Sequence, residues 1–401
     1  MAHYTSHTTS DAGDQAFDLS HIFIGREQQL DHFKIYLDRW QQRMFAADPG
    51  ESIVTTAPSP NNKLQGLIVL LYGRGGFGKS TLLTRYREMV LAENRNLLPG
   101  QSTVTASTIV DWEFAIEGKR SLFNPPPGQE IDAAAYFQAL CGQLAISLDK
   151  NPKDFKEYQS AVRDTEKARK DASGVLDSMQ KDDRYAWLRG LTIEAIRGAV
   201  RTYIPGSGVV VDNPSVKSAT DEAAKLTQEQ ISRIHDRLRD RLGNKLGDYL
   251  DSPLRLGLAL GHDLHDFAKN FPLLIFFDTY EEVDEGDCLL RIVMRAAGLR
   301  VGWMLAGRDN LWAGPGQLDR SIALEYGYKE LVPADRGLAI DFNAGGVGAF
   351  TFSDIKDYFD LLCKKVGHQL QLPRVTEEGA KRILDVTGGV PLAVKIAGRA
   401  A

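Results

Sequence analysis

A glycine-rich stretch with a lysine and two hydroxyls is the part of the sequence best suited to bind phosphate. Residues 73–80 read GRGGFGKS and match G-x-x-x-x-G-K-[ST] at every fixed position, and Thr81 follows. Glycines let the backbone curl so that successive amides point inward, and a following helix adds the partial positive charge of its first turn. In this pattern the lysine reaches the β- and γ-phosphates and the serine hydroxyl coordinates Mg²⁺. The stretch therefore predicts a nucleoside triphosphate site.

Each residue of this stretch has an expected role. Lys79 faces the β- and γ-phosphates, Ser80 holds Mg²⁺, and Thr81 contacts the α-phosphate. The loop residues whose backbone forms the cradle are Gly73, Gly75, Gly76, Phe77 and Gly78. The alternative, a glycine-rich hairpin, is disfavoured because an apolar strand pattern precedes the stretch and a helical pattern follows it.

A second group of candidate residues follows another apolar run. Residues 271–285 read FPLLIFFDTYEEVDE, so that Asp278 ends the run and Glu281 and Glu282 come three and four residues later. Open α/β sheets bind ligands at the carboxyl edge of their strands, where Asp278 should lie. Phosphoryl transfer needs a carboxylate near Mg²⁺ and a base for the attacking water. We expect Asp278 in the first role and one of the two glutamates in the second, and the spacing does not decide between them.

A third run ends in an arginine. Residues 302–310 read GWMLAGRDN, which puts Arg308 just beyond a strand pattern. A cation at this edge can sense a γ-phosphate, as arginines do in phosphoryl transfer. The alternative is a surface ion pair, which Arg-Asp after a strand often forms. We expect the γ-phosphate role.

The composition is typical of a globular protein without attraction to polyanions. The 401 residues are 43% hydrophobic and 25% charged, with a net charge of −5 and three scattered cysteines, as in reducing compartments. No apolar run approaches the roughly 20 residues that span a bilayer, and the N-terminus lacks the order of a signal peptide. We expect a cytoplasmic protein that contacts no membrane and, in the absence of a basic patch, no nucleic acid.

Strand and helix patterns alternate around these candidate residues. Residues 67–72, 107–114, 272–278 and 301–307 have the length and the β-branched or aromatic content of buried parallel strands. We therefore expect an α/β fold of the P-loop NTPase kind, with a five-stranded parallel sheet and helices on both of its faces.

The stretch between the second and third runs is unusually long. Residues 115–255 contain a helical pattern at 131–148 and a charged segment at 153–171 that predicts a solvated helix. We interpret the stretch as a helical insertion in the sheet. Helical patterns return after the last strands, and we expect residues 353–401 to form a helical lid that the end of the chain truncates.

Taken in order, the motifs resemble those of the signal-transduction ATPases with numerous domains (STAND), which include the NACHT and NB-ARC groups. The order is IGRE at 24–27, the phosphate loop, the acidic strand end, the strand with its arginine, and GGVPLAV at 388–394. The run DTYEE at 278–282 is similar to the NACHT form. The resemblance covers about residues 21–114 and 256–401, and its specificity comes from the order of motifs that are individually weak.

The resemblance implies further site residues and ligands. In this family the G-R-E segment lies near the adenine, which implies Ile24, Gly25 and Arg26. The proline of a G-x-P motif in the lid packs against the base, which implies Pro391. The implied ligands are ATP or ADP with Mg²⁺, and the implied partners are further copies of the chain in the ATP state and an unidentified trigger ligand or protein.

The sequence also departs from the family pattern. Thr or Ser usually precedes the arginine, whereas Ala306 and Gly307 stand here, and the insertion is longer than expected. The winged-helix domain, with a histidine that contacts ADP in many members, would lie beyond Ala401. The division we expect is a disordered tail (1–20), an N-terminal helix and loop (21–63), the ATPase core (64–352) and the lid.

The function implied by the resemblance is that of a molecular switch. ADP would hold the protein closed, ATP would favour oligomerisation and release of an effector, and hydrolysis would be slow. Two alternatives remain open: a motor-type AAA ATPase with steady turnover, and a nucleotide-dependent scaffold that barely hydrolyses. Turnover rate and ATP-dependent oligomer size distinguish the three.

Two other patterns favour structural roles. His262, Asp263, His265 and Asp266 are spaced like metal ligands, but this spacing is common on solvated helices. The amphipathic segment 189–204 is typical of membrane-surface or partner-binding helices, but packing inside the insertion is the preferred interpretation. A run of arginines that alternate with acids predicts a solvated face, and its members are Arg233, Arg237, Arg239 and Arg241.

Overall fold

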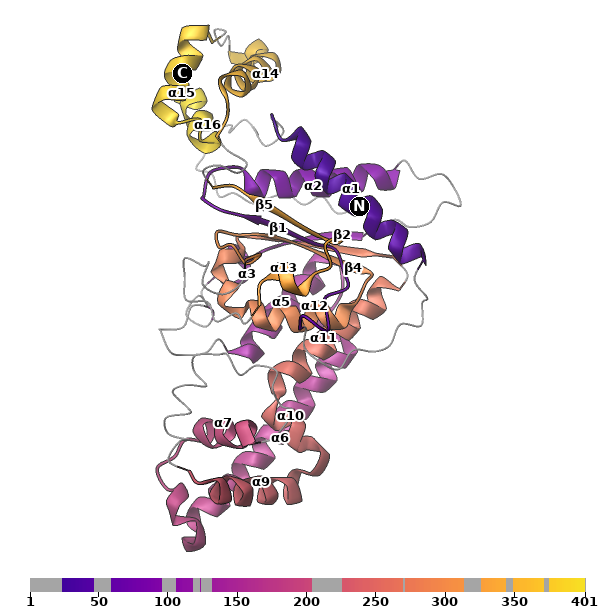
Figure 1. The fold of residues 1–401 in the computed structure, drawn as a ribbon, viewed down its shortest axis with the longest axis vertical. Coiled ribbons are helices and arrows are strands. Elements are labelled where there is room, and N and C mark those ends of the chain that lie inside the picture. The colour runs from indigo at the N-terminus through magenta and orange to yellow at the C-terminus, as the bar shows by residue number, and fades with distance from the viewer. Residues whose placement is uncertain are drawn as a thin grey trace.

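The computed structural model describes residues 24–46, 59–95, 106–117, 123, 132–203, 226–269, 271–313, 326–343, 349–370 and 375–400. The predicted tail at 1–20 and most of the loop predicted before the phosphate loop lie outside these residues. Figure 1 shows a central sheet covered by helices, three lid helices at one end of the molecule and a helical arm at the other.

The sheet contains five strands, all parallel, in the order β2-β3-β4-β1-β5. The strands are β1 (Ile68–Tyr72), β2 (Ala106–Asp111), β3 (Leu273–Asp278), β4 (Val301–Ala306) and β5 (Gly337–Asp341). This confirms the expected α/β fold with a five-stranded parallel sheet. None of the four predicted runs corresponds to β5, because this edge strand is short and partly exposed, so that its sequence, GLAID, lacks a continuous apolar pattern.

Side chains of each strand alternate between two hydrophobic cores, as the period of two in an extended chain requires. In β1, Val69 and Leu71 face α1 (Glu27–Ala46) and α2 (Lys79–Arg95). Ile68 and Leu70 face the opposite core, which the sheet shares with α5 (Ala133–Ser147), α11 (Ser252–Ala268) and α12 (Asp287–Ala297). The short helices α3 (Trp112–Ala115) and α13 (Tyr328–Leu331) also lie on this side of the sheet (Figure 1).

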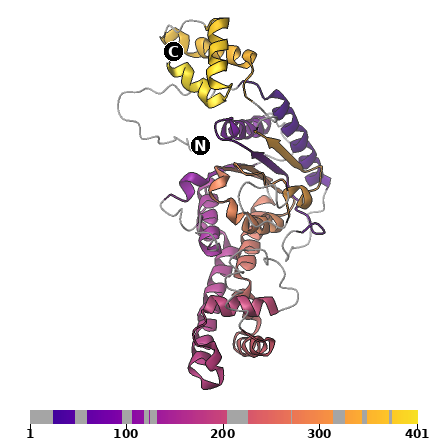
Figure 2. The same ribbon diagram turned by 60° about the vertical axis from the view of Figure 1, so that its left-hand side comes forward.

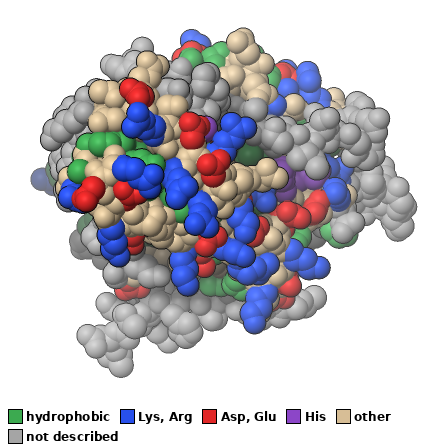
Figure 3. Space-filling model, turned by 90° about the horizontal axis from the view of Figure 1, so that it is seen from below, with side chains coloured by type: hydrophobic (Ala, Val, Ile, Leu, Met, Phe, Trp, Pro, Cys, Tyr) green, Lys and Arg blue, Asp and Glu red, His purple; other side chains and the backbone are tan. Residues whose placement is uncertain are grey.

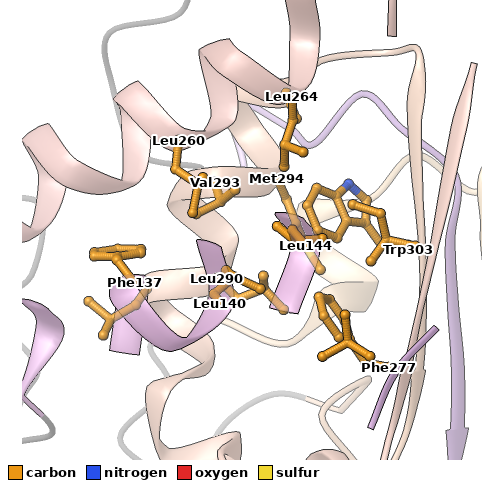
Figure 4. Close-up of a cluster of buried hydrophobic side chains, with 14 of the residues drawn as sticks. Phe137, Leu140, Leu144, Leu260, Leu264, Phe277, Leu290, Val293, Met294 and Trp303 are labelled. Atoms are coloured by element: carbon orange, nitrogen blue, oxygen red, sulfur yellow. The ribbon is translucent and has the colours of Figure 1, made fainter. Parts of the chain in front are cut away.

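The larger core is dense in aromatic and aliphatic side chains. Figure 4 shows leucines of α5 and α11 meeting side chains of α12 beside Phe277 and Trp303, which come from the sheet. Trp303 stacks on Phe277 with 6.0 Å between ring centroids. Fully burying one such side chain stabilises the fold by about 1.5–3 kcal/mol, so this layer contributes much of the stability.

The second strand ends earlier than the sequence pattern predicted. The predicted run extends to residue 114, but β2 ends at Asp111 and a helical turn begins at Trp112. The Trp112 ring is fully buried and stacks on Tyr136 of α5 with 5.7 Å between centroids. Its aromatic character therefore reflects packing beneath the sheet and not continuation of the strand.

The helical arm is built from residues between β2 and β3. Its helices are η2 (Pro152–Asp154), α6 (Lys156–Lys181), η3 (Asp183–Leu188), α7 (Ile193–Tyr203), α9 (Gln228–Leu242), η4 (Gly243–Lys245) and α10 (Leu246–Leu250). The arm extends away from the sheet in both ribbon views (Figures 1 and 2). It has a hydrophobic cluster of its own, in which Leu176, Ile196 and Leu238 are fully buried.

The predicted solvated helix of the insertion is more amphipathic than expected. Residues Lys156–Lys181 do form a helix, but Tyr158, Ala161, Ala168 and Leu176 are buried along one side of it. For the segment 189–204, the preferred interpretation was packing inside the insertion. The structure agrees with it, since Ile196 and Val200 of α7 are buried in the hydrophobic cluster of the arm.

The far end of the arm is charged. Figure 3 looks onto this end and shows Lys and Arg side chains mixed with Asp and Glu. The four arginines of α9 named above are all exposed, as their alternation with acids predicted. Both signs of charge are interspersed here, which is typical of a solvated surface.

A buried carboxylate of α11 joins the arm to the core. Asp263 is 4% exposed and accepts hydrogen bonds from the backbone amides of Glu157 (3.1 Å) and Tyr158 (2.8 Å). It therefore caps the start of α6, whose own preceding residue supplies no side-chain cap. Burial raises the pKa of Asp263, and the two amides oppose this shift. In the described part of the chain no cluster of His, Cys, Asp and Glu suits a metal ion.

The lid consists of α14 (Phe352–Leu370), α15 (Glu377–Thr387) and α16 (Pro391–Ala400). A small core of Ile355, Phe359, Ala380 and Val394 holds the three helices together, and Ile24 packs against it.

Two further short helices, η5 (Tyr280–Glu282) and η6 (Asp284–Gly286), follow β3. Among the residues described, no helix combines the length and apolar character needed to cross a membrane.

We predict that Asp263→Ala lowers the free energy of unfolding by about 1–2 kcal/mol, because two buried amides at the start of α6 lose their acceptor. Urea denaturation followed by circular dichroism measures the change. Asp266→Ala is the matched control on the same helix, since Asp266 is exposed and its carboxylate pairs with Lys269 Nζ at 2.6 Å on the surface. Equal destabilisation by both substitutions would contradict the capping role.

Candidate functional site

The phosphate loop connects the end of β1 to the start of α2 at the carboxyl edge of the sheet. Gly73, Gly76 and Gly78 have φ angles of +125°, +84° and +89°, which residues with a side chain rarely adopt. A Cβ at Gly73 would also come within 2.9 Å of the Phe342 carbonyl carbon, at the end of β5. Glycine at these positions therefore follows from the backbone path of the loop.

The lysine of the loop is held by the loop itself. Lys79 Nζ donates hydrogen bonds to the backbone oxygens of Gly73 (2.7 Å) and Arg74 (2.9 Å). Burial lowers the pKa of Lys79, and the nearby Glu281 carboxylate opposes the shift. The ammonium group lines a cavity, so an anion placed there can replace the carbonyl contacts.

A hydrogen bond joins the loop to the end of β3. Ser80 Oγ donates to Asp278 Oδ1 at 2.9 Å, although the two residues are 198 positions apart in the sequence. Asp278 Oδ1 also accepts from the Thr279 amide at 2.9 Å, and Thr279 has a left-handed backbone with φ +53°. Such strain costs of order 1–3 kcal/mol, and it persists only where neighbouring contacts hold it.

The charge environment at this point favours a cation. Burial raises the pKa of Asp278, against the hydrogen bonds from Ser80 and Thr279. Asp111 lies opposite Asp278 in the register of β2 and β3, and burial raises its pKa as well. The Ser80 hydroxyl and the Asp278 carboxylate lie 2.9 Å apart, and both are oxygen ligands of the kind that Mg²⁺ takes.

The two glutamates after Asp278 differ in position. Glu281 lines the cavity and accepts a hydrogen bond from Arg308 Nε at 2.9 Å, whereas Glu282 is not among the cavity-lining residues. The geometry thus separates two residues between which spacing alone did not choose. Arg308 does not line the cavity itself. Its hydrogen bond to Glu281 connects it to a residue that does.

A buried polar network supports this turn from below. Asp287, which is fully buried, accepts hydrogen bonds from the hydroxyls of Tyr280 and Tyr328, both at 2.8 Å, and from Arg291 Nε at 2.6 Å. Arg291 also lies over the Tyr328 ring, 4.3 Å from its centroid. Because Tyr280 directly precedes Glu281, the network fixes the short helix that presents the glutamate. Spacing alone did not reveal these residues.

The cavity at this edge has a volume of about 310 Å³. Its walls come from the N-terminal segment, the phosphate loop, the ends of β3 and β4, and the lid. The lining residues are Ile24, Arg26, Gly75, Gly76, Phe77, Gly78, Lys79, Ser80, Thr81, Asp278, Thr279, Glu281, Ala306, Phe350, Tyr358, Pro391, Leu392 and Lys395. Of the predicted site residues, Gly25, Gly73, Glu282 and Arg308 do not line it.

The lid closes one side of the cavity through backbone contacts. The Leu392 amide at the start of α16 donates to the Gly76 oxygen at 3.0 Å, and Phe350 N donates to Gly389 O at 2.7 Å. The N-terminal segment also reaches the loop, since Arg26 Nη2 donates to the Phe77 oxygen at 3.4 Å, and Arg26 has a φ of +85°. Both the lid and the N-terminal segment thus touch the phosphate loop directly.

Six lining residues were not among the predicted site residues, and they are Thr279, Ala306, Phe350, Tyr358, Leu392 and Lys395. Phe350 and Tyr358 add aromatic surface at the lid side, and Lys395 adds a third basic residue beside Arg26 and Lys79. Lys395 follows Pro391 by four positions, which puts the two on the same side of a helix, so this spacing could have identified it. Nothing in the pattern around Phe350 indicated a site.

Comparisons with known proteins leave the site to be interpreted from its geometry. No family model, no curated protein and no solved structure matches this chain.

We predict that Gly389→Ala destabilises the protein by about 2–4 kcal/mol, because the new Cβ meets the Phe350 oxygen and the backbone is left-handed. The ideal Cβ would lie 2.4 Å from that oxygen, at a φ of +72°. Thermal unfolding and limited proteolysis of the lid measure the effect.

Gly388→Ala is the matched control. Gly388 has a φ of +58° but no atom within 4 Å of the ideal Cβ, so only the backbone strain of about 1 kcal/mol applies. Identical stabilities of the two variants would show that the contact between Gly389 and Phe350 does not hold the lid in place.

Proposed function

We propose that this chain binds ATP and ADP with Mg²⁺, hydrolyses ATP slowly and acts as a nucleotide-controlled switch of the STAND type. The observation that carries the proposal is the 2.9 Å hydrogen bond from Ser80 to Asp278. It brings a phosphate-loop hydroxyl and a strand-end carboxylate together beside a lysine and a glutamate in one cavity. Those four groups meet the requirements of phosphoryl transfer: phosphate binding, metal binding and a base.

The cavity has two chemically different ends that suit the two ends of a nucleotide. Loop amides, Lys79 and the start of α2 form the end for phosphates. Apolar and aromatic surfaces of Ile24, Phe350, Tyr358 and Pro391 supply the end for the base. A volume of about 310 Å³ lies at the lower end of the range for ligand pockets, which suits a site partly open to solvent.

Mg²⁺ fits the oxygen ligands that the loop and β3 bring together. Magnesium is usually held by one or two protein oxygens together with substrate phosphates, so Ser80 and Asp278 would suffice. When bound, the ion supplies positive charge that neutralises the phosphate oxygens during transfer. Burial of Asp278 favours this use, because a cation stabilises the ionised carboxylate.

The chain's own residues then have distinct tasks. Lys79 exchanges its two carbonyl contacts for phosphate oxygens. Glu281 lines the cavity and would orient a water molecule as the base, and we assign this task to it because Glu282 is not among the lining residues. Arg308, at the end of the neighbouring strand, pairs with Glu281 and is the cation that would sense the γ-phosphate.

Switching follows from the contacts of the lid. Leu392 binds the Gly76 oxygen, and Pro391, Leu392 and Lys395 line the same cavity as the phosphate loop. A nucleotide in the cavity therefore touches both bodies and changes the free energy of their association. Assembly of further copies in the ATP state, and the identity of a trigger, are proposals that rest on the resemblance alone.

We predict that Lys79→Ala abolishes ATP binding, with a loss of at least about a hundredfold in affinity, because the cation facing the β- and γ-phosphates is removed. Isothermal titration calorimetry with MgATP measures the affinity, and circular dichroism checks that the fold persists. Lys34→Ala, an exposed lysine on α1, is the control and should bind as the unmodified chain does. Unchanged affinity of Lys79→Ala would refute the proposed function.

We further predict that Glu281→Gln lowers ATP turnover by about a hundredfold or more while ATP remains bound, because a general base contributes at least that factor. Phosphate release under saturating ATP measures turnover. Glu282→Gln should retain turnover, and the reverse outcome would move the base to Glu282. Turnover of many ATP molecules per second by the unmodified chain would favour a motor-type ATPase over a switch.

A further inference from the structure

The ion pair between Arg308 and Glu281 bridges two adjacent strands at the phosphate end of the cavity. Arg308 Nε lies 2.9 Å from Glu281 Oε1, and the side chains are 62% and 13% exposed, respectively. Glu281 follows β3 and lines the cavity, while Arg308 follows β4. The Arg308 side chain thus lies outside the cavity and contacts the carboxylate of Glu281, which lines it.

Backbone positions hold Arg308 close to the phosphate loop and Gly307 close to the glutamate. The Arg308 carbonyl accepts a hydrogen bond from the Gly73 amide at 3.1 Å, which ties the arginine to the first glycine of the loop. Gly307 lies next to the glutamate, since an ideal Cβ there would be 3.4 Å from Glu281 N and 3.8 Å from Glu281 Oε2. Gly307, which directly precedes the arginine, is therefore packed against this turn.

The pair is within electrostatic reach of the lysine that would bind the outer phosphates. Burial lowers the pKa of Lys79, Glu281 opposes this shift and Arg308 reinforces it. A phosphate group beside Lys79 would consequently feel the charge of both members of the pair.

We propose that Glu281, besides acting as a base, sets the preference between ATP and ADP by holding Arg308. This inference rests on the proposed function. A γ-phosphate competes with the Glu281 carboxylate for the guanidinium, so triphosphate binding must break the pair. A diphosphate ends one phosphate short and leaves the pair intact. The pair therefore weakens ATP binding selectively, and its release frees the carboxylate for its role as a base when the triphosphate is present.

A double-mutant cycle with the full 401-residue chain tests this inference. Calorimetry measures the affinities for MgADP and for the Mg²⁺ complex of a β,γ-imido ATP analogue, which is not hydrolysed. The variants are Glu281→Gln, Arg308→Ala and their combination, and Arg308→Gln replaces Arg308→Ala if the latter unfolds. Glu282→Gln is the matched control for removing one negative charge next to the site.

We expect Glu281→Gln to bind the analogue about threefold to tenfold more tightly while its affinity for ADP changes less than about twofold, the range that a partly exposed ion pair supports. In the Arg308→Ala background the same substitution should give no such gain, because no guanidinium is left to release. Glu282→Gln should leave the ratio of the two affinities unchanged.

Three results would overturn the inference, and each is distinguishable from the others. A gain that persists without Arg308 would mean that Glu281 acts by simple repulsion of the phosphate. Equal gains for ADP and the analogue would mean that the pair does not discriminate between them. Failure of the unmodified chain to bind either nucleotide would instead reject the proposed function, and the inference with it.

Discussion

Strand β1 is hydrogen-bonded to β4 on one side and to β5 on the other, and the rest of the molecule depends on this constraint. Parallel strands end at one edge, so residues that follow different strands meet there whatever their separation in sequence. Gly73 follows β1, Asp278 ends β3, and Arg308 follows β4, and each is tied to another of these segments by a hydrogen bond. The site is thus a consequence of strand register. A change that shifted β1 would therefore disturb the relative positions of all these groups at once.

The helical arm and the lid depend on this core in different ways. The arm continues into the core through α6 and α11, and a buried carboxylate on α11 caps α6, so the two are joined by packing and by hydrogen bonds. The lid has a small core of its own and meets the phosphate loop through Leu392 and its neighbours. A body that has its own core and meets a ligand site is suited to move when its contacts there change, which is how the proposed switch would operate.

Sequence patterns identified most of the candidate site residues but did not determine how these residues are arranged in space. The phosphate loop and Asp278 could be predicted because each belongs to a local pattern with a physical requirement. Pro391 was implied by the family resemblance alone. Glu281 and Glu282 could not be separated, since only the turn of η5 and the buried support of Tyr280 by Asp287 decide which carboxylate enters the cavity. Phe350 and Tyr358 were missed because the surface they add exists only once the lid folds over the loop.

The sequence by itself determined the α/β class, the buried strands and the chemistry available at their ends, because alternation of apolar runs and local glycine requirements are properties of neighbouring residues. It did not determine β5, the end of β2 at Asp111, or the capping role of Asp263. Only the tertiary structure decided these features and the pairing of Arg308 with Glu281. They depend on contacts between segments far apart in the chain, and such contacts leave no periodic signal in either segment.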